Sequence, residues 1–267
     1  MTTPTLDAVA EGLQQGRLAP YLGPGMLALC EGPRPPADPL ALAAHLAARS
    51  SVPGKIRNRV TAVAQFIENF KHRKTLVGLM DEAFAKPAAP SALHRWLAAL
   101  PVPLIVDAWY DDTLRSALAS RTDWSEVQGL SQSEHFGRWA GWYGDEQATT
   151  VLYKPWGGHA PASNYLVSDS DFVEVLTEID IQTPIPAAVQ QRRAALGFVF
   201  LGCRFDDQLP RAFARQILKR SGGPHVAVLP GEPTRMERRF LDEMGIERIA
   251  LPLAEVAAVF TGQAALA

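Results

Sequence analysis

The chain has 267 residues, with 26 Lys and Arg against 28 Asp and Glu and only two cysteines, Cys30 and Cys203. This length suffices for one large α/β core, so we expect a single domain over residues 1–267 without disulfide or metal staples. The net charge of −2 argues against nucleic acid and anionic lipid as partners, which leaves a small molecule, a protein or a second copy of the chain.

Two apolar patterns alternate along the chain. Apolar residues at a spacing of three or four predict amphipathic helices, and short apolar runs bounded by Gly or Pro predict buried strands. Thr5 and Asp38 stand where helix N-caps are expected. In chain order we predict a helix at 5–16, a strand at 18–22, a helix at 38–48, two joined helices over 58–85, a strand at 101–107, a helix at 111–119, strands at 149–154 and 166–168, a helix at 169–178, a strand at 196–202, a helix at 207–219, a strand at 226–229, a helix at 234–244, a strand at 246–251 and a helix at 254–261.

This alternation predicts an α/β fold, with a Rossmann-like parallel sheet and helices on both faces. The uninterrupted apolar run 196–202 (LGFVFLG) is typical of a strand buried on both faces of such a sheet. Ligands of these folds bind beyond the carboxyl ends of the strands. The residues that follow the strands, 23–26, 107–112, 154–159 and 202–207, are therefore the candidate site.

Cysteine usage and the N-terminus predict the compartment. Neither cysteine belongs to a Cys-x-x-Cys pair, so we expect no metal site and a cytoplasmic location. No basic stretch precedes an apolar signal core, and no apolar run approaches the roughly 20 residues that cross a bilayer, so no membrane contact is expected. The many Ala, Arg and Pro residues are typical of a GC-rich bacterial source.

Near the N-terminus an apolar strand runs directly into two glycines (LAPYLGPGM, 18–26). Gly23 and Gly25 allow the backbone to turn without a Cβ, and amides at the next helix start are able to face a phosphate. Ala28 occupies the place of the third glycine in Gly-x-Gly-x-x-Gly, and Pro24 lacks an amide donor. The segment is either a phosphate cradle or a plain tight turn.

Four segments, taken in order, resemble the SIR2-like (sirtuin-related) family, in its bacterial form without a zinc module. YLGPGM (21–26) is similar to the family's Gly-Ala-Gly turn, and VDAWYDDTL (106–114) to its Thr-Asn-Tyr-Asp segment. YKPWG (153–157) is similar to Lys-Leu-His-Gly, and LGCRFDD (201–207) to Gly-Tyr-Ser-x-x-Asp. The resemblance implies the DHS-like NAD/FAD-binding architecture with a small helical insertion at about 56–99.

The resemblance also implies a ligand and the residues that hold it. The ligand is NAD or a related dinucleotide, such as ADP-ribose or FAD. The implied cofactor-binding residues are Gly23, Pro24, Gly25, Met26, Trp109, Asp111, Trp156, Gly157, Gly202, Cys203 and Asp206.

Two departures from the family pattern affect the chemistry. Trp109 stands in place of the family's asparagine and Trp156 in place of its catalytic histidine. An indole offers one N–H donor and no acceptor, so neither residue is able to act as a general base. His159 either replaces the missing base or is an ordinary loop histidine. A zinc-dependent protein deacetylase is not expected, because its two Cys-x-x-Cys pairs are absent.

Three functions remain open. The first is a dinucleotide-binding protein with impaired or absent hydrolysis, in which the indoles of Trp109 and Trp156 stack on a flat ring of the ligand. The second is an NAD+ glycohydrolase that releases nicotinamide with the help of His159. The third is a catalytically dead structural or regulatory subunit, in which the tryptophans fill the site and the aromatic segment 138–143 (RWAGWY) contacts a partner.

Overall fold

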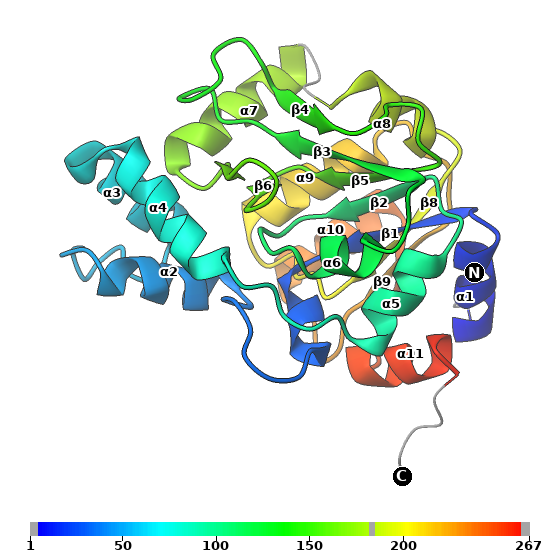
Figure 1. Ribbon diagram of the computed structural model, residues 1–267. Coiled ribbons are helices and arrows are strands. Elements are labelled where there is room, and N and C mark those ends of the chain that lie inside the picture. The colour runs from blue at the N-terminus through cyan, green and yellow to red at the C-terminus, as the bar shows by residue number, and fades with distance from the viewer. Residues whose placement is uncertain (1–4, 182–184, 263–267) are drawn as a thin grey trace.

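A mainly parallel β-sheet forms the centre of the molecule (Figure 1). The computed structural model describes residues 5–181 and 185–262, so the other residues of the expected 1–267 domain lie outside the described ranges. Within these ranges eight strands form the sheet in the order β10-β9-β8-β1-β2-β5-β3-β4, and only β3 and β4 pair antiparallel. The strands are β1 (Leu18–Leu22), β2 (Leu104–Asp107), β3 (Trp124–Gly129), β4 (Ala140–Tyr143), β5 (Thr150–Lys154), β8 (Gly197–Leu201), β9 (His225–Val228) and β10 (Ile246–Ile249); a separate hairpin consists of β6 (Gly157–Gly158) and β7 (Asn164–Tyr165).

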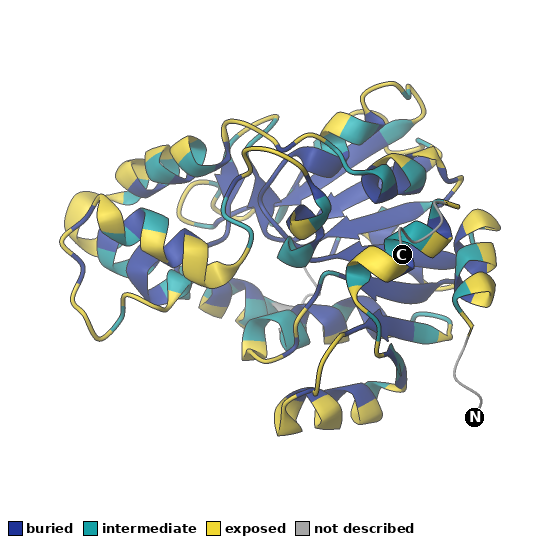
Figure 2. Cartoon of the chain, turned by 90° about the horizontal axis from the view of Figure 1, so that it is seen from below, coloured by how far each residue is buried: buried dark blue, intermediate teal, exposed yellow. Residues whose placement is uncertain are grey.

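Helices cover both faces of the sheet, as the sequence predicted. Figure 2 shows buried strands between helices whose outer sides are exposed. One face carries α7 (Asp169–Ile181), α8 (Ala187–Arg193), α9 (Gln208–Leu218) and α10 (Arg235–Met244); the other carries α1 (Leu6–Gln14), η1 (Pro24–Leu29), α5 (Ala92–Ala99), α6 (Thr113–Leu118) and α11 (Leu253–Phe260). None of the helices in the described ranges combines the length and apolarity that a bilayer crossing requires.

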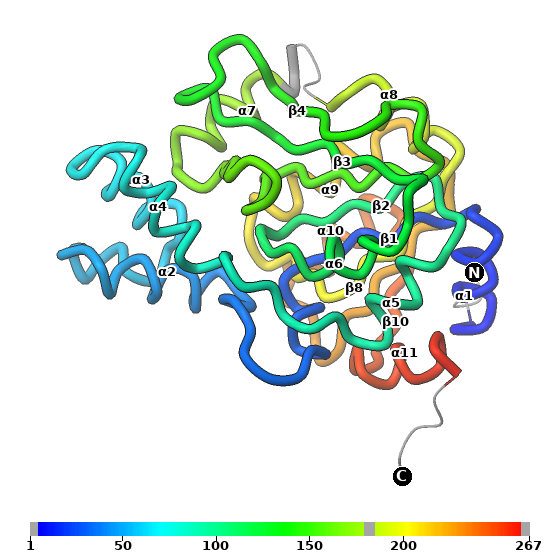
Figure 3. The backbone as a smooth tube through the Cα atoms, in the orientation of Figure 1, coloured from blue at the N-terminus to red at the C-terminus, as the bar shows by residue number. Residues whose placement is uncertain are grey.

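A helical module lies beside the sheet and consists of α2 (Pro39–Ala48), α3 (Val60–Lys71) and α4 (Arg73–Phe84) (Figure 3). The sequence predicted an insertion at about 56–99. The module in the structure begins earlier, because α2 packs against α3 and α4. It also ends earlier, because Leu93 and Leu97 of α5 pack in the core between the sheet and α6.

The predicted strand at 166–168 is wrong. Strand β7 ends at Tyr165, and the amides of Val167 and Ser168 donate to Asp171 Oδ2 at 2.9 and 3.0 Å. The Asp171 carboxylate, in the first turn of α7, therefore accepts hydrogen bonds from these two amides. The same amides are then not available to pair with a neighbouring strand. The predicted N-caps Thr5 and Asp38 are confirmed, since each side chain accepts a backbone N–H of the first helical turn.

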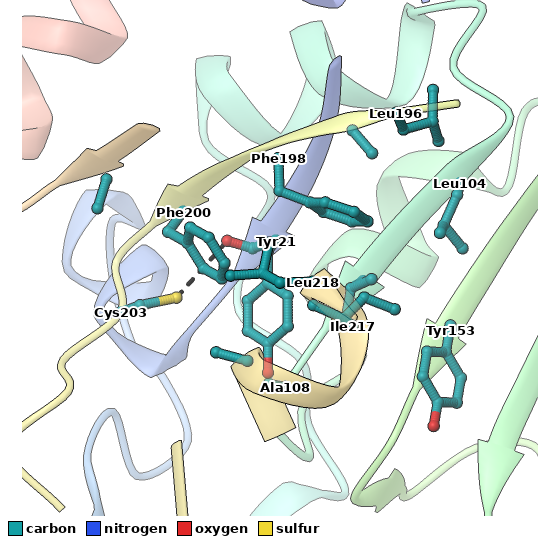
Figure 4. Close-up of a cluster of buried hydrophobic side chains, with 14 of the residues drawn as sticks. Tyr21, Leu104, Ala108, Tyr153, Leu196, Phe198, Phe200, Cys203, Ile217 and Leu218 are labelled. Carbon is teal, nitrogen blue, oxygen red and sulfur yellow. Dashed lines mark hydrogen bonds between the residues drawn. The ribbon is translucent and has the colours of Figure 1, made fainter. Parts of the chain in front are cut away.

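Aromatic side chains fill the core between β1, β8 and α9 (Figure 4). The rings of Tyr21 and Phe200 lie 4.8 Å apart between centroids, and Phe205 packs edge-on against Phe200. The Cys203 thiol lies against this cluster and donates to the Tyr21 carbonyl at 3.6 Å. Burial raises the pKa of Cys203, so this thiol behaves as a core group.

The backbones at the ends of β1 and β8 are in direct contact. Gly23 N donates to Leu201 O and Gly25 N donates to Gly202 O, each at 2.9 Å. A Cβ on Gly25 would lie 2.8 Å from the Gly202 carbonyl oxygen, and Gly202 itself has a φ of +65°. These glycines are required because two backbones approach closely here.

This contact predicts that Gly25→Ala destabilises the protein by roughly 1–3 kcal/mol, because backbone must move to admit the methyl group. Gly78→Ala is the matched control: Gly78 lies within α4, where an added Cβ meets nothing within 4 Å. That change should stabilise the protein by about 0.5–1 kcal/mol, since Ala favours the helix. The measurement is the midpoint of urea unfolding for both variants. Equal midpoints would contradict the close backbone contact at Gly25.

Candidate functional site

Four neighbouring strands bring the four predicted segments together at one edge of the sheet. Because β8, β1, β2 and β5 are adjacent and parallel, residues 202–207, 23–26, 108–112 and 155–159 all follow their carboxyl ends. The helical module α2–α4 packs in one apolar cluster with two of these segments, through Trp109, Tyr110 and Trp156. The candidate site is therefore the space between the strand ends and this module.

The glycine turn directs its amides into the protein. Gly23 and Gly25 donate to the β8 end, Met26 N donates to Gly23 O at 3.1 Å, and Pro24 has no N–H. Residues 23–26 therefore leave no backbone donor for a phosphate in this structure.

Trp109 and Trp156 face one another at the ends of β2 and β5. Their ring centroids lie 6.2 Å apart at an interplanar angle of 62°, with exposed fractions of only 1% and 7%. Trp109 Nε1 donates to Pro36 O at 2.8 Å, whereas Trp156 Nε1 is buried without a partner. Tyr110 packs against both indoles, and the ring edges of Phe172 and Phe213 close around Trp156. The two indoles thus occupy a common aromatic layer on the side of the glycine turn.

Little space remains beside this layer. A cavity that shares Phe213 with the tryptophan cluster has a volume of about 20 Å³ and is lined also by Tyr21 and Tyr153. It admits about one water molecule, whereas pockets for drug-sized ligands measure about 300–1,000 Å³. A larger hollow of about 540 Å³ lies beside Pro101, Arg121 and Thr149, which precede β2, β3 and β5, and so lies at the opposite end of the strands.

Lys154 is a fully buried cation between the two tryptophan segments. Its Nζ lies 3.3 Å from Asp107 Oδ2 and also donates to the carbonyl of Asp111. Burial alone would lower the pKa of Lys154, but Asp107, Asp112 and nearby carboxylates outweigh it and raise the pKa. Burial raises the pKa of Asp107 to about 7, against the opposing charge of Lys154. The ammonium group therefore stays charged and holds the β2–α6 loop against β5.

The structure places His159 away from the indoles and beside helix α4. Its Nδ1 lies 3.1 Å from Asp81 Oδ1 and 3.3 Å from Tyr165 Oη, and Tyr165 also donates to Asp81 Oδ1 at 2.8 Å. Aromatic contacts run from Tyr165 to Tyr110 and from Tyr110 to Trp156. The sequence interpretation missed Asp81, which is followed directly by Glu82 in α4 and carries no signal of its own along the chain.

The remaining predicted residues have mainly structural contacts. Asp111 Oδ1 accepts the Thr113 amide at 2.9 Å at the start of α6, and Asp206 is exposed. Gly157 has a φ of +76° in the tight β6–β7 hairpin. The 202–207 loop is held by the buried Glu237, which sequence reasoning did not single out and which accepts the Phe205 amide at 3.1 Å. Among the described residues, no three His, Cys, Asp or Glu side chains converge to hold a metal ion.

A family model described as a SIR2-like domain matches residues 103–249. The chain belongs to the SIR2-like family. The matched span includes the strand-end segments at 108–112, 155–159 and 202–207, and the glycine turn lies before it. The comparison with curated proteins gave no match.

SIR2-like proteins generally bind NAD-type dinucleotides, so the fit of a dinucleotide can be tested on this site. The pyrophosphate does not fit the glycine turn as it stands, because the amides of residues 23–26 are bonded within the protein or absent. Trp109 and Trp156, which the resemblance implies as ring-binding residues, are themselves almost fully buried. In this SIR2-like chain a dinucleotide pyrophosphate is able to use the glycine turn only if the amides of Gly23 and Gly25 leave the β8 end.

The buried cation predicts a large effect of Lys154→Met. Removing one partner leaves Asp107 and its neighbouring carboxylates buried without compensation, which should cost about 3–5 kcal/mol in unfolding free energy. Arg49→Met is the control, because the Arg49–Glu82 pair is about half exposed and should change stability by no more than about 1 kcal/mol. Urea unfolding measures the free energy of unfolding of both variants. Similar small losses of this free energy would show that Lys154 is dispensable for stability.

A second prediction concerns acid stability and rests on His94 at the start of α5. Burial lowers the pKa of His94 to about 4, where an unfolded histidine titrates near 6.5. Between these values the unfolded chain binds the additional proton, so stability falls as the pH drops from about 6.5 to 4. His94→Gln keeps a side-chain acceptor in the capping box with Ser91. Urea unfolding should show that the free energy of unfolding falls less between pH 6.5 and 4 in the variant than in the unmodified protein. An equal fall in both proteins would contradict the prediction.

Proposed function

We propose that this SIR2-like protein is a dinucleotide-binding protein with impaired or absent hydrolysis of its ligand. The observation that carries the proposal is the contact between two buried indoles at the ends of β2 and β5, where the family resemblance calls for an asparagine and a histidine. An indole accepts no proton and no hydrogen bond. Loss of a positioned base typically costs about 10²–10⁴-fold in rate.

Ligand binding is supported by the family and by one feature of the site. Trp156 Nε1 is buried without an acceptor, and a buried unpaired donor is costly unless something satisfies it. Flat rings such as nicotinamide, adenine or isoalloxazine stack well on indoles. NAD, ADP-ribose and FAD are therefore the proposed ligands, and they require the displacement of part of the aromatic layer.

A second candidate is a catalytically dead structural or regulatory subunit. The bonded amides of the glycine turn and the almost complete burial of both indoles favour it. In this case the tryptophans act as permanent core and no dinucleotide enters. The exposed Phe136, in the loop before β4, is then a candidate contact for a protein partner.

We expect prolonged incubation with NAD to release nicotinamide at least about 100-fold more slowly than an active SIR2-like hydrolase assayed in parallel. Turnover comparable with that enzyme would contradict the proposal. Free nicotinamide, measured by chromatography against a protein-free blank, is the readout.

Tryptophan fluorescence distinguishes binding from a filled site. Addition of NAD, ADP-ribose or FAD should quench the emission, and Trp109→Phe and Trp156→Phe should each reduce the change. Trp124→Phe is the control, because Trp124 begins β3 at the opposite end of the sheet from the site. If no dinucleotide alters the emission of the unmodified protein, the structural subunit is the better account.

A further inference from the structure

His159, which begins the turn between β6 and β7, is held by a carboxylate from another part of the fold. Asp81 belongs to helix α4 of the helical module, whereas His159 and Tyr165 belong to the hairpin segment at the sheet edge. Asp81 Oδ1 accepts the Tyr165 hydroxyl at 2.8 Å and lies 3.1 Å from His159 Nδ1. The three side chains form one hydrogen-bonded group across the boundary between module and sheet.

These contacts determine the tautomer of His159. A carboxylate only accepts hydrogen bonds, and Asp81 Oδ1 already receives the Tyr165 proton, so the bond to His159 requires a proton on Nδ1. A neutral imidazole with Nδ1–H carries its lone pair on Nε2. His159 Nε2 has no partner among the described residues, and the side chain is 29% exposed, so a small molecule is able to approach.

Backbone hydrogen bonds also fix the turn that carries His159. The amide of His159 donates to Tyr110 O at 3.3 Å, and the next amide, of Ala160, donates to Asp112 Oδ2 at 3.0 Å. An added Cβ on Gly158 would lie 2.6 Å from the buried stem of Lys154, so the turn is packed tightly on the sheet. Asp112 Oδ1 is buried without a partner beside this turn, and burial raises the pKa of Asp112.

We propose that His159 is a general base for a bound water or hydroxyl group, with Asp81 as the residue that positions it. This site is separate from the tryptophan layer and does not depend on dinucleotide binding. In the hydrolysis of an ester, the water oxygen bonds to the carbonyl carbon while its proton passes to His159 Nε2. The C–O bond then breaks, and the alcohol oxygen keeps the electron pair and takes the proton from His159, which leaves the carboxylic acid, the alcohol and a neutral imidazole.

The first test is the tautomer, which requires no activity. A long-range ¹H–¹⁵N spectrum of the full chain, assigned with His159→Gln, should show His159 protonated at Nδ1 at neutral pH. Asp81→Leu removes the acceptor and should shift the ring toward the Nε2–H form, whereas Asp81→Asn keeps an acceptor and should shift it less. An Nε2–H tautomer in the unmodified protein would overturn the proposal.

The second test is hydrolysis of p-nitrophenyl acetate, whose leaving group needs no proton and which therefore reports the base alone. His159→Gln should lower the rate about tenfold, less than for a positioned substrate because this probe is not held in place. Asp81→Leu should also lower it, because the carboxylate that holds Nδ1 and leaves Nε2 free is lost. Asp112 and Tyr165 are the other titratable groups around the ring.

His72→Asn is the control for both measurements, because His72 is an exposed histidine at the junction of α3 and α4. It should leave the hydrolysis rate unchanged. If His159→Gln and His72→Asn hydrolyse the ester as fast as the unmodified protein, the Asp81–His159 pair is an ordinary surface ion pair worth at most about 1 kcal/mol.

Discussion

The burial of one charged amine, on Lys154, constrains the whole strand-end region. A fully buried ammonium group is tolerated only when carboxylates and carbonyls surround it, and here they come from the β2 end and the loop that follows. That requirement joins the segment containing Trp109 to the segment containing Trp156. Trp156 lies two residues after Lys154 and Trp109 two residues after Asp107, so this ion pair is a direct link between the two tryptophan segments.

The molecule thus keeps the SIR2-like frame while its strand ends carry different chemistry. Parallel strands still deliver four loops to one edge, as ligand sites in such folds require. At that edge the amides of Gly23 and Gly25 are hydrogen-bonded to the end of β8. The indoles of Trp109 and Trp156 pack against each other. Asp81 and His159 form a separate hydrogen-bonded pair. The aromatic layer and the Asp81–His159 pair are thus two distinct groups at this edge.

Sequence patterns predicted the parallel sheet well, and they failed where buried groups are polar. Strand β3 was missed because Glu126 and Gln128 face a buried hydrogen-bond network and give no apolar alternation. The aromatic run at 138–143 was considered as a partner contact and not as a strand, and the structure shows that residues 140–143 form the antiparallel edge strand β4. Residues 92–99 fell within the insertion that the family resemblance implied, but α5 packs on the core of the sheet, and a resemblance of strand-end motifs does not show which core receives a helix.

By itself the sequence determined the alternation of strands and helices, the caps at Thr5 and Asp38, and the resemblance to the family. These properties are local, because they depend on residue type and spacing along the chain. Only the tertiary structure decided that the amides of Gly23 and Gly25 are bonded to the β8 end, that the two indoles touch, and that Asp81 orients His159 from 78 residues away. Such pairings depend on which distant segments the sheet order brings together, and no periodicity within either segment encodes them.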